Sequence, residues 1–249
     1  MDGTSNQRMV SLAVESSGGR MSPLTQSAHQ VLSILKKDLL IEWRARTRVL
    51  SLLCFTAIIL LLFSFAVGPD TATLRRHCGG YLWLSLLFCS TAMLSRSLRI
   101  EEESGAMDSL LLAPISPIWI FLGKATANAI ELFIIGLMTL PICFALCDVA
   151  IADSAWRLLV IIALGSAGLA APGTLFATIT ERIQGQVLLM PLLLFPLVVP
   201  MLLAAVKSTS LILTGDLMDE GGDWLTLLVF FNAMYWPLCG VLFERVVEV

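Results

Sequence analysis

The sequence has few charged residues: Asp, Glu, Lys and Arg make up 14% of its 249 residues, against about 25% in average soluble domains. Hydrophobic residues make up 57%, and the mean hydropathy is +0.86. This composition excludes an ordinary soluble enzyme domain and indicates a membrane protein. The net charge of −3 gives no indication of a nucleic-acid partner.

The sequence also lacks the motifs of common catalytic sites. Gly123-Lys124 is its only Gly-Lys pair, but Ala125 follows it and Ile118 stands where the leading glycine of a Walker A motif belongs. No HExxH, GxSxG or metal-spaced His/Cys cluster occurs. We therefore expect no catalytic, cofactor-binding or metal-binding residues, and a chain that is not an enzyme.

The six cysteines have no CxxC spacing. Inside apolar runs a free thiol behaves as a small hydrophobic group, and four of the cysteines lie there: Cys54, Cys89, Cys143 and Cys239. Cys78 and Cys147 flank such runs and could meet on one face of the membrane. Whether they form a disulfide or remain free thiols depends on geometry that the sequence does not define.

Long hydrophobic runs dominate the rest of the chain. A spanning helix needs about 20 mostly apolar residues to cross the hydrocarbon core. The sequence therefore predicts an all-α polytopic membrane helix bundle with six transmembrane helices, at about residues 49–67, 79–94, 118–146, 156–180, 187–206 and 224–243.

The distribution of basic residues predicts the orientation, because Lys and Arg near span ends favour the cytoplasm. With a cytoplasmic N-terminus, ten of them lie inside: Lys36, Lys37, Arg44, Arg46, Arg48, Arg96, Arg99, Lys124, Arg182 and Arg245. Four lie outside: Arg75, Arg76, Arg157 and Lys207. Both termini are therefore predicted to be cytoplasmic.

The segment before the first span divides into two parts. Residues 1–25 are polar and rich in Ser and Gly, which predicts a disordered tail, and residues 26–249 form the transmembrane domain. Leu32, Leu35, Leu39 and Trp43 recur at helical spacing, which predicts an N-terminal amphipathic helix. It lies in the headgroup plane or docks on the bundle, and the two interpretations are compatible.

The longest predicted cytoplasmic connection follows the second span. It combines an acidic turn, a glycine, a short apolar face and a proline: Glu101, Glu102, Glu103, Gly105, Met107, Leu110, Leu111 and Pro114. This pattern predicts a brief amphipathic helix whose apolar face needs a partner or returns to the membrane surface.

That loop resembles the first cytoplasmic loop of ABC-2-type permeases, where it forms the coupling element seated on the ATPase. Other segments are similar to the haem exporter protein B (CcmB) family of cytochrome c maturation, over roughly residues 31–243. They are Gly68-Pro69-Asp70, Gly80-Tyr81-Leu82-Trp83, Ala113-Pro114-Ile115-Ser116-Pro117 and Phe195-Pro196-Leu197-Val198-Val199-Pro200. The chain departs from the pattern at Ala106-Met107, where a Thr-Leu-like pair is expected.

The resemblance implies a multi-pass permease subunit in the bacterial inner (plasma) membrane, and it also implies the roles of the partner subunits. A partner ATPase binds ATP, other membrane subunits and a chaperone handle haem, and the permease is a dimer. Haem is then a possible substrate, and His77 with Cys78 could touch its iron, although a lone loop histidine is more often solvated. The alternatives are an ABC-2 exporter of lipid, polysaccharide or drug, and an ion-coupled secondary transporter, which would need more paired carboxylates.

Two further patterns lie inside predicted spans. Lys124, Asn128 and Glu131 share one helix face, and they either hold helices together or couple conformational change to substrate. The fourth span carries a surface of small residues, which predicts close packing against its neighbours: Gly165, Ser166, Gly168, Ala171 and Gly173.

Overall fold

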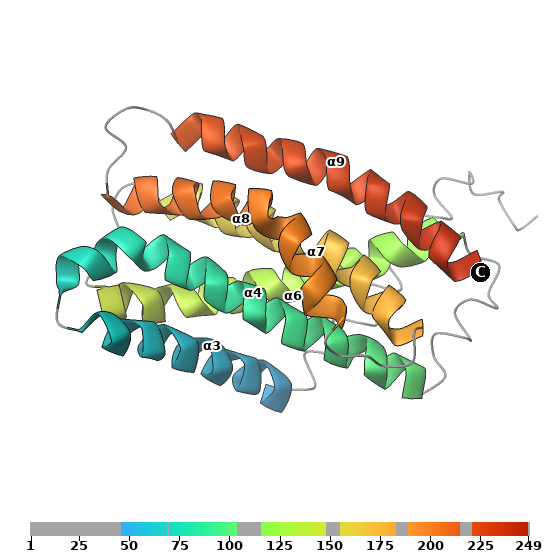
Figure 1. The fold of residues 1–249 in the computed structure, drawn as a ribbon, viewed down its shortest axis with the longest axis horizontal. Helices are drawn as coiled ribbons and strands as arrows, with labels where there is room; N and C mark the ends of the chain where they lie inside the picture. The colour runs from blue at the N-terminus through green and yellow to red at the C-terminus, as the bar shows by residue number, and fades with distance from the viewer. Residues whose placement is uncertain are drawn as a thin grey trace, which may run out of the picture.

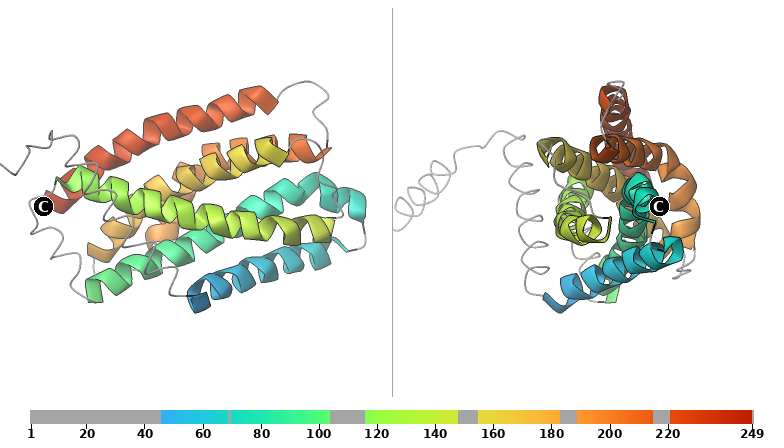
Figure 2. Two further views of the ribbon diagram at one scale, coloured as in Figure 1. Left: turned by 180° about the vertical axis from the view of Figure 1, so that it is seen from behind. Right: turned by 90° about the vertical axis from the view of Figure 1, so that its left-hand side faces the viewer.

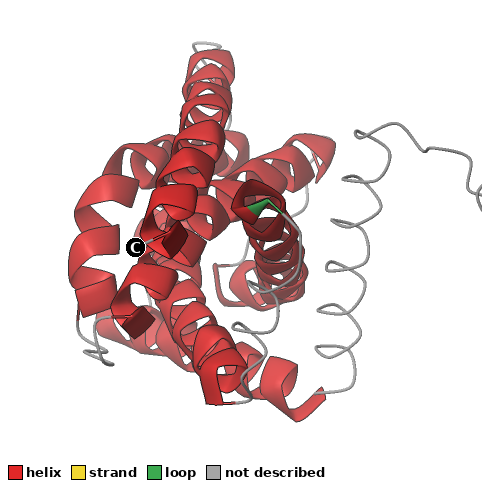
Figure 3. Cartoon of the chain, turned by 90° about the vertical axis from the view of Figure 1, so that its right-hand side faces the viewer, coloured by secondary structure: helices red, strands yellow, loops and turns green. Residues whose placement is uncertain are grey.

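The computed structural model describes residues 46–68, 70–103, 116–147, 155–182, 189–214 and 221–248. The predicted disordered tail and amphipathic helix lie outside these residues. The described elements are six helices: α3 (Arg46–Val67), α4 (Thr71–Glu103), α6 (Pro117–Cys147), α7 (Ala155–Arg182), α8 (Leu189–Thr214) and α9 (Gly221–Glu248). Viewed along the bundle, the described segments are helical except for short loop residues (Figure 3).

All six helices are long and apolar enough to cross a membrane, which confirms the predicted all-α bundle of six spans. Consecutive helices run in opposite directions (Figure 1). The α3–α4 turn and the end of α6 therefore lie at one end of the bundle. The start of α6 and the C-terminus lie at the other end.

Helix α7 is the centre of the bundle, packing against α4, α6, α8 and α9. Inside the protein, 72% of its apolar window is buried, compared with 17% for α3 and 22% for α9. The two outer helices present large side chains such as Phe65 and Phe230, which are 80% and 67% exposed. Such surfaces suit a lipid environment, and Figure 2 shows α3 and α9 at the periphery from two further sides.

The turn between α3 and α4 explains why α4 begins at Thr71, earlier than the predicted residue 79. Gly68 has a φ of 76° and ends α3, since glycine adopts this left-handed conformation without steric cost. Asp70 then caps α4: its Oδ1 accepts hydrogen bonds from the amides of Ala72 (3.1 Å) and Thr73 (3.3 Å). The Thr73 hydroxyl donates to Oδ2 at 2.6 Å, and this bond lowers the pKa of the Asp70 carboxyl below its ordinary value.

The early start of α4 corrects one prediction. His77 was placed in an external loop, but it lies within α4, as do Arg75 and Arg76. Helix α8 likewise continues to Thr214, so that Lys207 lies within a helix and not after one. In both cases the helix continues past its apolar run. The long polar side chains at the helix end can reach water while the backbone stays helical.

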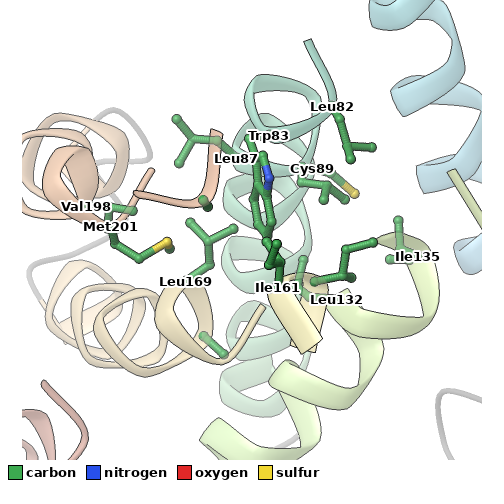
Figure 4. Close-up of a cluster of buried hydrophobic side chains, with 14 of the residues drawn as sticks. Leu82, Trp83, Leu87, Cys89, Leu132, Ile135, Ile161, Leu169, Val198 and Met201 are labelled. Atoms are coloured by element: carbon green, nitrogen blue, oxygen red, sulfur yellow. The ribbon is translucent and has the colours of Figure 1, made fainter. Parts of the chain in front are cut away.

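Trp83 of α4 is the central side chain of the core. It is fully buried, and its Nε1 donates a hydrogen bond to Thr209 Oγ1 of α8 at 2.9 Å. Figure 4 shows its indole ring between Leu87, Cys89 and Ile161. On α7, the absence of a side chain at Gly165 makes room for this ring, because an added Cβ would lie 1.9 Å from Trp83 Cη2.

Two other glycines of α7 also make room for large side chains of neighbouring helices. A Cβ at Gly168 would lie 3.0 Å from Met201 of α8, and one at Gly173 would lie 2.4 Å from Leu94 of α4. The close packing predicted for the small residues of the fourth span is therefore confirmed at these positions. Their role is to admit large side chains from α4 and α8 into the centre of the bundle.

Candidate functional site

The predicted intramembrane polar residues all lie on α6, within the bundle. Lys124 and Glu131 are only 6% and 7% exposed, and Asn128 is half-buried. The Asn128 side-chain amide donates to Thr174 Oγ1 of α7 at 2.9 Å, and that hydroxyl donates to the Ala170 carbonyl at 2.7 Å. Asn128 thus links α6 to the central helix. Whether Lys124 and Glu131 couple conformational change to substrate stays a prediction.

The predicted ATPase-coupling loop is described only in part. Glu101, Glu102 and Glu103 are the last three residues of α4, while Gly105, Met107, Leu110, Leu111 and Pro114 lie outside the described residues. The end of α4 and the start of α6 lie at the same end of the bundle as the C-terminus (Figure 1). The two helix ends that flank the loop therefore lie at the end that the basic residues predict to be cytoplasmic.

A cavity of about 1050 Å³ lies at the opposite end, between α3, α4 and α8. Apolar and aromatic side chains supply most of its wall, and three basic residues contribute to it. The residues that line it are Phe63, Arg76, His77, Gly80, Tyr81, Trp83, Leu84, Val199, Leu202, Leu203, Val206, Lys207, Ser210 and Leu211.

Aromatic contacts and a close helix approach shape this cavity. Tyr81 stacks on Phe63 of α3 with ring centroids 4.8 Å apart, and His77 lies 6.3 Å from Tyr81 in a tilted arrangement. Gly79 brings α4 close to α8, since a Cβ there would meet Ser210 Oγ at 2.8 Å. The stacked rings therefore form an aromatic part of the cavity wall.

The cavity combines apolar walls with basic side chains. Arg76, His77 and Lys207 are exposed, and they come from two helices that are distant in sequence. Apolar walls with a few convergent polar groups are typical of ligand sites. The sequence identified Arg76 and Lys207 only as separate external basic residues. Arg76 and Lys207 line the same cavity only because α4 packs against α8.

Three cysteines meet at the same end of the bundle. The Sγ atoms of Cys78 and Cys143 are 2.9 Å apart, and those of Cys78, Cys143 and Cys147 all lie within 4.8 Å of one another. Cys78 and Cys147 therefore do meet, as their positions beside apolar runs allowed, and both are free thiols. Cys143 was treated only as a core residue, although its spacing of four from Cys147 on one helix was a signal that they share a face.

Six antiparallel apolar helices, with charged residues enclosed by the bundle, define a polytopic membrane protein. The model of the CcmB protein family matches residues 29–240. The chain belongs to the CcmB family.

Curated relatives agree with this assignment. Heme exporter protein B of Rhodobacter capsulatus is 32% identical over 197 residues, which cover 79% of this chain and 86% of the relative. The protein of the same name from Paracoccus denitrificans is 29% identical over 202 residues, 81% of this chain and 89% of the relative. The protein of the same name from Haemophilus influenzae is 26% identical over 192 residues, which cover 77% of this chain and 86% of the relative. The family resemblance seen in the sequence is thus confirmed.

Proposed function

We propose that this protein is the membrane permease subunit of an ABC transporter complex that handles or exports haem in cytochrome c biogenesis. The observation that carries this function is the family match over residues 29–240, on a chain with six membrane spans. In this proposal the chain has no catalytic activity. A partner ATPase hydrolyses ATP, and the permease couples that reaction to the delivery or release of haem.

The proposal includes a location and a set of partners. The protein lies in a bacterial inner membrane with both termini in the cytoplasm, as its basic residues favour. It works as a permease dimer with the ATPase, haem-handling membrane subunits and a haem chaperone. The cavity then opens toward the periplasmic end of the bundle, where haem is used for cytochrome c.

The chemistry of the cavity supports haem as the ligand. Haem is a flat, largely apolar macrocycle with two carboxylates on one edge. The stacked Tyr81 and Phe63 rings offer a flat aromatic surface, and Arg76 and Lys207 offer positive charge. Hydrogen bonds between cationic side chains and carboxylates are among the stronger ones in proteins.

Complementation tests both the function and the cavity. In a strain lacking its own haem exporter protein B, the wild-type chain is expected to restore cytochrome c, measured by haem staining of membranes. Combined Arg76→Glu and Lys207→Glu is expected to lower that yield about tenfold, because both positive charges of the cavity become negative and repel the haem carboxylates. Arg157→Glu is the matched control, because Arg157 is exposed at the same end but does not line the cavity.

The outcomes separate the two claims. If the wild type inserts with its ATPase but restores no cytochrome c, the haem function is wrong. If the wild type works and the double variant works equally well, the function stands and the cavity is not the haem contact. A lipid then becomes the better candidate for its occupant.

Glu131 is tested in the same strain. We expect Glu131→Gln to keep the folded yield, and cytochrome c within about twofold of wild type, because the amide retains hydrogen-bonding capacity. Glu131→Leu removes that capacity from a site only 7% exposed and is expected to lower the folded yield. A Glu131→Gln variant with normal yield but little cytochrome c would contradict the structural interpretation and assign Glu131 to coupling.

A further inference from the structure

Three thiols converge where α4 passes the end of α6. Cys78 lies on α4, while Cys143 and Cys147 are one turn apart on α6 and Cys147 is its last residue. Their side chains are 0%, 1% and 4% exposed. No other His, Cys, Asp or Glu within the described ranges joins the group, whose sulfur atoms all lie within 4.8 Å of one another.

We propose that Cys78, Cys143 and Cys147 form a binding site for a soft monovalent metal ion, and that Cu(I) is the ion this donor set fits. The site is separate from the haem function and does not depend on it. It departs from our expectation that the chain has no metal ligands, because that expectation rested on sequence spacing and these cysteines are brought together by helix packing.

The spacing of the sulfur atoms suits a shared ion. Metal–sulfur bonds of about 2.3 Å place two ligands of one ion about 4 Å apart. The 4.8 Å limit on the three sulfur atoms includes this separation. Cys78 and Cys143, now 2.9 Å apart, must separate by about 1 Å, which small side-chain rotations can supply.

The number and kind of ligands favour Cu(I) over the alternatives. Soft thiolates select Cu(I), zinc and iron–sulfur clusters. Structural zinc is almost always four-coordinate, but this group holds three donors in the part of the chain that the structure describes. The three cysteines are free thiols, so no disulfide takes up two of the donors.

Binding is an exchange of protons for a metal ion, with no change in oxidation state. Each thiol that ligates as a thiolate releases one proton, and the Cu(I)–sulfur bonds replace the sulfur–hydrogen bonds. The ion joins α4 to α6 at this end of the bundle. Cys147 is the last residue of α6 and, at 4%, the most exposed of the three.

Anaerobic titration of the full-length protein in detergent tests the site, with Cu(I) and a coloured Cu(I) chelator as competitor. We expect one Cu(I) per chain. Cys143→Ser or Cys147→Ser is expected to weaken binding more than about 100-fold, since loss of an outer-shell partner alone costs 10–100-fold. The matched control is Cys239→Ser, because Cys239 is 2% exposed but lies on α9.

A measurement on the wild-type protein tests the site even if the cysteine variants fail to fold. X-ray absorption of the copper-loaded protein is expected to show a first shell of two or three sulfur atoms and no nitrogen or oxygen ligands. A nitrogen- or oxygen-dominated shell, absence of competitive Cu(I) binding by the reduced wild type, or equal affinity in folded Cys147→Ser and Cys239→Ser would each overturn the proposal.

Discussion

Replacing Gly165 with alanine is expected to remove most of the folded protein. The added methyl group would lie 1.9, 2.4 and 2.8 Å from three carbon atoms of the Trp83 ring. The ring cannot rotate away cheaply, because it is fully buried and its Nε1 is hydrogen-bonded to Thr209. Either α7 moves away from α4, or the indole loses its site and its hydrogen bond.

The expected size of this effect exceeds that of ordinary overpacking, which costs about 1–3 kcal/mol. Folded yield is measured by size-exclusion chromatography of a fluorescent fusion in detergent. Gly222→Ala is the matched control, because nothing lies within 4 Å of a Cβ there. Trp83→Leu, introduced together with Gly165→Ala, is expected to restore part of the yield. Equal yields for Gly165→Ala and Gly222→Ala would show that this clash does not limit folding.

The six spans were predictable because length and hydropathy are local properties of the chain. The ends of the helices were less predictable from the sequence. Helix α4 begins eight residues before the predicted start at 79 because Asp70 caps it, and a cap satisfies backbone groups without adding any hydropathy. The polar residues Arg75, Arg76 and His77 were therefore assigned to a loop, although they lie within the helix.

Sites that depend on helix pairing could be predicted only in part. The small residues of α7 indicated close packing, but only the structure identifies Trp83 as the side chain admitted at Gly165. Cys78 and Cys147 each flank an apolar run, so the sequence allowed them to meet on one face of the membrane. Cys143 lies inside a run, where the sequence does not distinguish a core thiol from a member of a cluster.

The second large effect is expected at the connection between α4 and α6. Its sequence places an acidic turn before a predicted apolar face formed by Met107, Leu110 and Leu111. The described ends of the connection, Glu103 and Pro117, lie at the same end of the bundle as the C-terminus (Figure 1). We propose that this connection is the main contact with the ATPase.

Replacing both Leu110 and Leu111 with serine is expected to release the ATPase, lowering the amount that co-purifies per permease at least about tenfold. The physical reason is that burying each leucine at a contact contributes about 1.5–3 kcal/mol, which serine does not replace. Leu112→Ser is the control, since its predicted position is off the apolar face, and a C-terminal cytoplasmic reporter verifies that the spans still insert. Charge reversal at Glu102 and Glu103 is expected to give a milder, salt-sensitive loss, because charges at the rim of an interface mainly steer association. If the double serine variant keeps its ATPase at wild-type stoichiometry, the loop is not the coupling element, and the alternative that its apolar face returns to the membrane surface is favoured.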